Sequence, residues 1–167
     1  ALSASGSTST APTPLRGRAL HSLGLLTGMQ GDRGRARGLH AEALAIGRAL
    51  DDRELMGLAC LGLGEQAVAR GDLAAAHDLI QQGSTHLARV DDRRGRAVAL
   101  TNLANVLWSM GRPGEASALN HEARTLYERA GDGRGVAWSV TNLGRIALQR
   151  GAFDEAIPLL HDALRRY

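Results

Sequence analysis

The sequence contains no lysine, a single cysteine and very few aromatic residues. Its 20 basic residues are all arginine and are accompanied by 17 acidic residues, which leaves a formal charge of +3. So small an excess is not typical of a nucleic-acid-binding protein, and we expect no direct nucleic-acid partner. Cys60 has no second cysteine with which to form a disulfide within the chain, which favours a reducing, cytoplasmic environment.

Long apolar runs are missing as well. No stretch approaches the ~18 consecutive apolar residues of a membrane-spanning helix, so we expect no association with a membrane. Hydrophobic residues nevertheless make up 44% of the chain while aromatic residues make up 3%, so the core must consist of leucine and alanine. Both residues favour helices over strands. The composition therefore predicts an all-α protein.

The first residues differ in composition from the rest. The segment "ALSASGSTSTAPTP" is uncharged and rich in Ser, Thr, Ala and Pro, and it lacks the basic start and apolar centre of a signal peptide. We expect residues 1–13 to be a flexible linker and residues 14–167 to be the folded domain. Because the chain does not begin with Met, we also expect it to be part of a longer protein.

The remainder of the chain repeats itself every forty residues. The segment "TNLANVLWSMG" at 101–111 returns as "TNLGRIALQRG" at 141–151. Written in rows of forty, the chain aligns Gly31, Gly71, Gly111 and Gly151, then Leu23, Leu63, Leu103 and Leu143, then Ala36, Ala76, Ala116 and Ala156, and finally the small residues Gly24, Gly64, Ala104 and Gly144. Such a period predicts stacked units that share one continuous core.

Each unit carries the pattern of two helices. In the third unit, Leu100, Leu103 and Leu107 recur at helical spacing, Asp92 can cap the start of the helix, and Gly111 can end it. The same pattern predicts eight antiparallel helices at residues 14–30, 33–50, 53–70, 73–90, 93–110, 113–130, 134–150 and 153–166. They group into four repeats at about 14–51, 52–91, 92–131 and 132–167.

Residues 139–164 carry the most specific resemblance. The segment "SVTNLGRIALQRGAFDEAIPLLHDAL" is similar to a tetratricopeptide repeat. The residues at the small and apolar signature positions of that family are Leu143, Gly144, Gly151, Phe153, Ala156, Leu160 and Ala163. The resemblance implies a right-handed superhelical solenoid of four helix-turn-helix repeats, with a concave groove for peptides or partner proteins lined by the first helices. Repeats of about forty residues resemble those of bacterial multidomain signalling ATPases and transcription regulators, which implies a sensory or regulatory part of a larger protein.

The face expected to line this groove is polar and carries both tryptophans. The candidate ligand-binding residues are Thr101, Asn102, Asn105, Trp108, Trp138, Thr141, Asn142 and Arg145. An Asn amide can donate to and accept from a peptide backbone, Arg145 can hold a carboxylate, and an exposed Trp138 can anchor an apolar group. We expect a non-enzymatic module that binds a peptide or protein segment here. The alternative is that these Asn side chains bond a neighbouring helix and that Trp138 covers the adjacent repeat.

The six histidines do not form a catalytic or metal-binding pattern. His121 and His161 lie one repeat apart in the same column, so they stack instead of converging on one ion, and no His-x-x-x-His or Cys pair occurs. We expect surface histidines, a buried Cys60, and no metal, cofactor or catalytic site.

The last repeat suggests a second hypothesis, a structural or oligomerisation role. Leu160, Ala163 and Leu164 are expected to have no following repeat to cover them. Solenoids need a polar terminal cap to stay soluble. A homo-oligomer formed through the C-terminal repeat is therefore the alternative function.

Overall fold

The computed structural model describes residues 11–166. Within this range it contains eight helices and no strand. The helices are α1 (Pro14–Met29), α2 (Arg33–Leu50), α3 (Arg53–Ala69), α4 (Leu73–Ala88), α5 (Arg93–Ser109), α6 (Pro113–Arg129), α7 (Gly133–Gln149) and α8 (Phe153–Arg166). All eight expected helices are present, and their ends differ from the expected ones by no more than one or two residues. Most of the expected linker at 1–13 lies outside the described residues; residues 11–13 are exposed and not helical.

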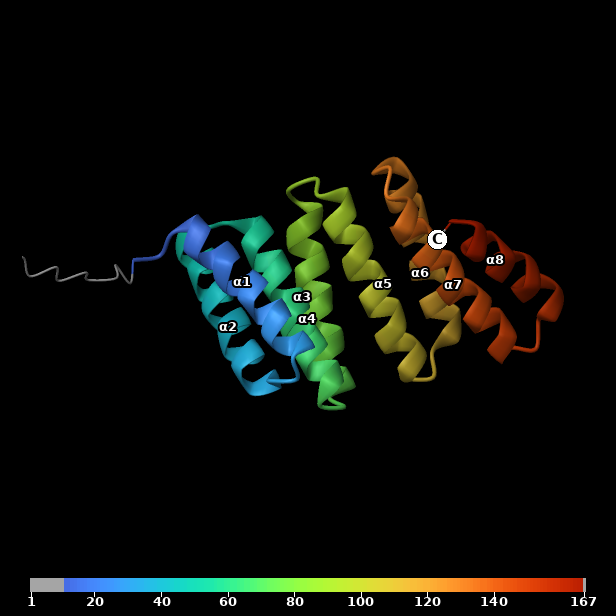
Figure 1. Ribbon diagram of the computed structural model, residues 1–167, viewed down its shortest axis with the longest axis horizontal. Helices are drawn as coiled ribbons and strands as arrows, with labels where there is room; N and C mark the ends of the chain where they lie inside the picture. The colour runs from blue at the N-terminus through green and yellow to red at the C-terminus, as the bar shows by residue number, and fades with distance from the viewer. Residues whose placement is uncertain (1–10, 167) are drawn as a thin grey trace, which may run out of the picture.

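The helices form a row of antiparallel pairs. α1 packs on α2, α3 on α4, α5 on α6 and α7 on α8, and the second helix of each pair also packs against the first helix of the next pair. Figure 1 shows the row running from α1 at one end to α8 at the other. The fold is therefore the expected all-α solenoid, in which each repeat contacts mainly its neighbours.

The turns are set by the columns of glycine and aspartate. Gly31, Gly71, Gly111 and Gly151 have φ angles of 91°, 78°, 76° and 73°. This left-handed conformation is strained for residues with a Cβ, which explains a glycine at each of these positions. At the turns between repeats, the carboxylates of Asp52, Asp92 and Asp132 accept hydrogen bonds from the amides of Leu55, Gly95 and Gly135 at 3.0, 2.8 and 2.9 Å. The roles predicted for Gly111 and Asp92 are thus confirmed, and the equivalent residues of the other repeats serve the turns in the same way.

The small column allows the two helices of a repeat to approach closely. A Cβ added to Gly64 would lie 2.5 Å from Cγ1 of Ile80, and one added to Gly144 would lie 2.7 Å from Cδ2 of Leu160. Both distances are far inside van der Waals contact. Glycine is therefore required where these side chains of the second helix rest on the first.

The column of Leu23, Leu63, Leu103 and Leu143 is fully buried only in the third and fourth repeats. Leu103 and Leu143 are buried, Leu63 is half-buried, and Leu23 is 42% exposed. The expected core column is thus incomplete at Leu23. The physical reason is that no second helix of an earlier repeat lies beside α1 in the described part of the chain.

The expectation that all histidines lie on the surface is wrong for His40. Its side chain is fully buried between Gly24 and Gly62; a Cβ added to these glycines would lie 2.6 and 2.5 Å from Cε1 of the imidazole. Neither ring nitrogen has a hydrogen-bond partner among the described residues. Cys60 is buried in apolar packing, as expected.

Candidate binding groove

The candidate site is formed by one face of the first helices α3, α5 and α7. Glu65, Asn105 and Arg145 lie forty residues apart and hold the same position in successive repeats. A cavity of about 190 Å³ opens between α3 and α5, lined by Glu65, Val68, Ile80, Asn102, Asn105, Val106 and Ser109. We call this face of the three helices the groove.

The acidic end of the groove is a hydrogen-bonded pair. Nδ2 of Asn102 donates to Oε1 of Glu65 over 3.4 Å. Partial burial raises the pKa of Glu65, and the hydrogen bond from Asn102 opposes this effect. One long hydrogen bond leaves several lone pairs of the carboxylate unused. The pair can therefore accept further N–H groups from a ligand.

The basic end of the groove is an arginine stacked on a tryptophan. The guanidinium carbon of Arg145 lies 4.3 Å from the centre of the Trp108 ring, an attractive cation–π arrangement. Nε1 of Trp108 donates to Oε1 of Gln149 on α7, which holds the ring in place. Arg145 is exposed and forms no ion pair with a described residue. Trp108 thus orients a cation that remains available for a ligand.

Trp138 supplies the apolar surface of the groove. It lies on α7 two helical turns before Arg145, which places both side chains on the same face of the helix. The side chain is 48% exposed. A half-exposed tryptophan beside polar groups is typical of a binding surface.

Three candidate residues are placed elsewhere by the structure. Thr101 is buried and donates to the carbonyl of Ala97 at 2.9 Å. Thr141 is half-buried and donates in the same way to Ala137. The proton of each hydroxyl is donated within its own helix, so neither hydroxyl can donate to a ligand while this bond holds.

The third of these candidate residues, Asn142, lies between two repeats and not on the open face of the groove. It is buried, and its Nδ2 donates to Oδ1 of Asn120 on α6 over 3.3 Å. Asn120 in turn donates to the carbonyl of Ala116. The alternative that Asn side chains bond a neighbouring helix therefore holds for Asn142, because its position in the repeat faces the second helix of the preceding repeat.

The set of candidates from the sequence omits Glu65. The signal that points to it is the forty-residue column shared with Asn105 and Arg145. Its contact with Asn102 crosses from one repeat to the next, so only the stacking of α3 and α5 brings the two side chains together.

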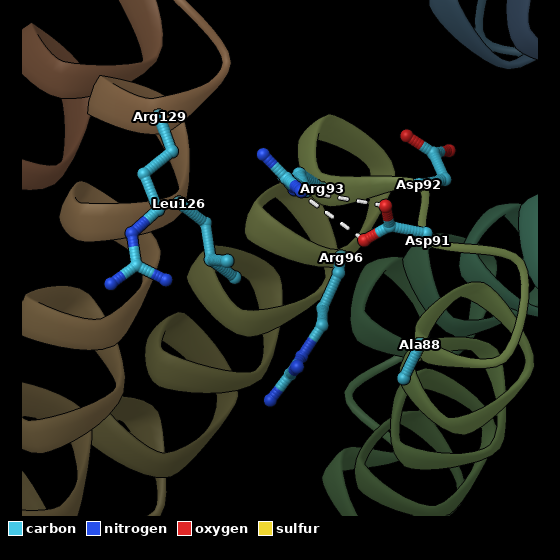
Figure 2. A pocket seen from close by; sticks show the side chains of 7 residues that line it. All are labelled: Ala88, Asp91, Asp92, Arg93, Arg96, Leu126 and Arg129. Carbon is cyan, nitrogen blue, oxygen red and sulfur yellow. Dashed lines mark hydrogen bonds and ion pairs between the residues drawn. The ribbon is translucent and has the colours of Figure 1, made fainter.

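A second cavity, of about 420 Å³, lies where the turn between α4 and α5 meets the end of α6 (Figure 2). It is lined by Ala88, Asp91, Asp92, Arg93, Arg96, Leu126 and Arg129. Most of its charged groups already have partners: Arg93 pairs with Asp91, Arg96 pairs with Glu122, and Asp92 caps α5. This cavity is therefore a weaker candidate than the groove.

Within residues 11–166, no group of three or more His, Cys, Asp or Glu side chains could hold a metal ion. None of the helices in that range has the length and apolarity needed to cross a membrane.

Sequence profiles of the tetratricopeptide repeat family match residues 16–50 and 95–167. The chain belongs to this family. The match covers the first repeat and the two that carry Asn105, Trp138 and Arg145. A search of curated proteins found no match to this tetratricopeptide repeat chain.

Solved structures show the same fold. BtubC (BKLC) from P. vanneervenii has a TM-score of 0.78 at 18% identity, over 90% of this chain and 62% of BtubC. A Rap protein complexed with competence and sporulation factor has a TM-score of 0.84 at 14% identity, over 91% and 43% of the two chains. A putative kinesin light chain with nearly identical TPR-like repeats from Podospora anserina has a TM-score of 0.73 at 20% identity, over 95% and 78%. The chain thus spans 62% and 43% of the length of the first two.

Proposed function

We propose that this tetratricopeptide repeat chain is a non-enzymatic module that binds an extended peptide or protein segment along the groove of α3, α5 and α7. Membership of a repeat family of interaction scaffolds supports a protein or peptide partner. The location of the binding site is inferred from Arg145. Its guanidinium is stacked on Trp108 and has no ion-pair partner among the described residues. An exposed and oriented cation is suited to a carboxylate on the ligand.

The other groove residues have complementary roles in this proposal. The amides of Asn102 and Asn105 pair with the ligand backbone, since each can donate and accept. Trp138 packs on an apolar ligand side chain. Trp108 positions Arg145, while Thr101, Thr141 and Asn142 make no direct contact with the ligand.

The structural neighbours support a regulatory setting for this binding. The Rap structure is that of a complex with competence and sporulation factor, so the same fold binds a partner in that protein. We further propose that this chain is the cytoplasmic sensory or regulatory part of a larger bacterial signalling or transcription-regulatory protein. Its forty-residue repeats and its similarity to part of longer chains support this setting.

The proposal can be tested with peptides selected by the full chain from a random display library. Their affinities are then measured by calorimetry for the parent chain and for Trp138→Ala, Asn105→Ala and Arg145→Ala. We expect each substitution to weaken binding about tenfold or more, the loss typical of a central contact.

The matched control is Arg35→Ala, which removes an exposed arginine from α2, outside the groove. This variant should bind like the parent chain. Circular dichroism confirms that all variants remain helical. Groove variants that bind as tightly as Arg35→Ala would refute the proposed location.

A further inference from the structure

The apolar residues at the end of α8 do not by themselves indicate a partner. Of the three residues expected to be uncovered there, Leu164 is exposed and Leu160 is half-buried. The expectation is wrong for Ala163, which is buried in the cluster between α5, α6, α7 and α8. No contact among the described residues shows what covers Leu164. The cavity between α3 and α5 gives more information about its occupant.

This cavity has an equivalent one repeat further along, between α5 and α7. The residues that line the two cavities are forty positions apart, so Glu65 corresponds to Asn105, Val68 to Trp108, and Asn105 to Arg145. Asn105 lines both cavities, because it belongs to the helix that they share. The two cavities are thus two versions of one site. We call the cavity between α3 and α5 the open site and the cavity between α5 and α7 the filled site.

The filled site is occupied by the chain's own side chains. Its remaining cavity is about 10 Å³, because the ring of Trp108 and the guanidinium of Arg145 are stacked there at 4.3 Å. The open site has Val68 in place of the tryptophan and Asn105 in place of the arginine, and its cavity is about 190 Å³. The shorter side chains therefore leave room for a side chain of a ligand where the filled site holds an arginine.

The open site also carries an acidic group that the filled site lacks. Glu65 is the only charged residue among the described residues that line it. Its carboxylate accepts a hydrogen bond from Asn102 and forms no ion pair with any residue in the range 11–166. The residue is exposed, so a ligand can reach it. A carboxylate without a cation beside it favours a positively charged group on the ligand.

The walls of the open site suit the stem of a long basic side chain. Val68, Ile80 and Val106 supply apolar surface beside the carboxylate of Glu65. The methylene groups of Arg and Lys pack on such surface while the charged end reaches a polar group. An acidic side chain would be repelled by Glu65, and a purely apolar one would leave it without a partner. The open site therefore fits Arg or Lys better than either.

We infer that the open site binds an arginine or lysine side chain of the segment that occupies the groove. The inference rests on the proposed function, since it specifies which segment the groove selects. The charged end of the ligand side chain lies against Glu65, and its stem packs on Val68 and Val106. Arg145 then holds an acidic group of the same ligand. Because packed helices lie about 8 to 10 Å apart, the two ligand groups are separated by roughly three extended residues.

Titration of the full chain with Nα-acetyl-arginine amide, followed by NMR, tests the open site with a defined probe. We expect saturable shifts of the methyl signals of Val68 and Val106. The citrulline analogue has nearly the same shape but no charge, and it should bind about tenfold more weakly or worse. Glu65→Gln should weaken binding of the arginine probe by a similar factor, because it removes the charge and keeps the shape.

Glu155→Gln is the matched control. It makes the same change at an exposed residue of α8, outside the groove, and should bind the arginine probe like the parent chain. Val68→Trp places in the open site the residue that the filled site has, so it should abolish the shifts at Val106. Circular dichroism verifies that each variant is folded. The inference is overturned if the parent chain shows no shifts at Val106, or if the citrulline analogue or Glu65→Gln binds equally well.

Selection from a random display library tests the open site with longer ligands. The parent chain should select peptides with a basic residue roughly three positions from an acidic one. Glu65→Arg should instead select peptides with an acidic residue in place of the basic one, because the charge of the site is reversed.

The two experiments separate failure of this inference from failure of the proposed function. Peptides that need Trp138 and Arg145 but show no preference for a basic residue would overturn the inference and leave the proposed function intact. Shifts of Val106 that depend on Glu65, in a chain whose peptides do not need Trp138 or Arg145, would support the open site and refute the proposed function.

Discussion

His40 is the residue whose surroundings differ most from its sequence pattern. It shares a column with Ile80 and Leu160, and like them it lies between the helices of a repeat. Burial lowers its pKa to about 4, and the charge of nearby His21, whose ring centre is 5.2 Å away, adds to the effect. The fold therefore holds the imidazole neutral, with both nitrogens lacking a partner among the described residues.

His40→Leu is expected to stabilise the chain at neutral pH. The substitution removes unpartnered buried nitrogens at similar volume, which is worth about 1 to 3 kcal/mol in the free energy of unfolding. Urea denaturation followed by circular dichroism measures the change. Ile80→Leu is the matched control, since this swap within the same column removes no polar group and should bring no gain. A less stable His40→Leu chain would show that His40 has partners in solution.

The parent chain and His40→Leu should differ in their response to acid. The pKa of His40 is lower in the folded than in the unfolded chain, so its neutral form favours the fold fully above pH 6.5. This stability is lost as the pH falls from about 6.5 to about 4, because only the unfolded chain then takes up the proton. His40→Leu should lose less stability across this window than the parent chain. Equal losses would indicate an ordinary pKa for His40.

At the scale of the helix, burial depends on which neighbours pack beside an element. The first helices have similar sequence patterns, but two second helices, α4 and α6, cover α5. The only second helix that packs on α1 in the described part of the chain is α2. The burial of the equivalent leucines in α1 and α5 differs accordingly. Leu103 is buried in the central cluster, whereas Leu23 is 42% exposed.

Leu103→Ala and Leu23→Ala form a matched pair at one repeat position. We expect Leu103→Ala to lower the free energy of unfolding by about 2 to 5 kcal/mol, because it leaves a cavity among packed side chains. Leu23→Ala should cost well under half as much, since part of its surface is already in contact with water. Chemical denaturation of both variants measures the difference. Similar costs would mean that Leu23 is covered in solution.

At the scale of the molecule, stability is distributed along a row of repeats. Each helix packs on the other helix of its own repeat and on the helices of the adjacent repeats. The resemblance in fold to BtubC and to Rap extends over nearly all of this chain and over only part of theirs.

The sequence alone was sufficient for the helices, their turns and the repeat architecture. These features depend on contacts within about one repeat: Gly111 ends α5 through its own φ angle, and Asp92 caps α5 through an amide three residues away. Because the sequence repeats every forty residues, these local signals recur in each repeat and are easy to recognise. The position of Arg145 on an open helix face also followed from helical periodicity.

Only the tertiary structure decided which polar side chains are available for a ligand. Asn102 and Asn142 share a column and a motif, but Asn142 faces Asn120 across the interface between repeats and is buried, whereas Asn102 is half-buried, lines the same cavity as Ile80 and donates to Glu65. His40 is buried because Gly24 and Gly62, on two other helices, leave room for it. Such pairings depend on which side chain the neighbouring repeat brings opposite, and the pattern of a single helix does not contain that information.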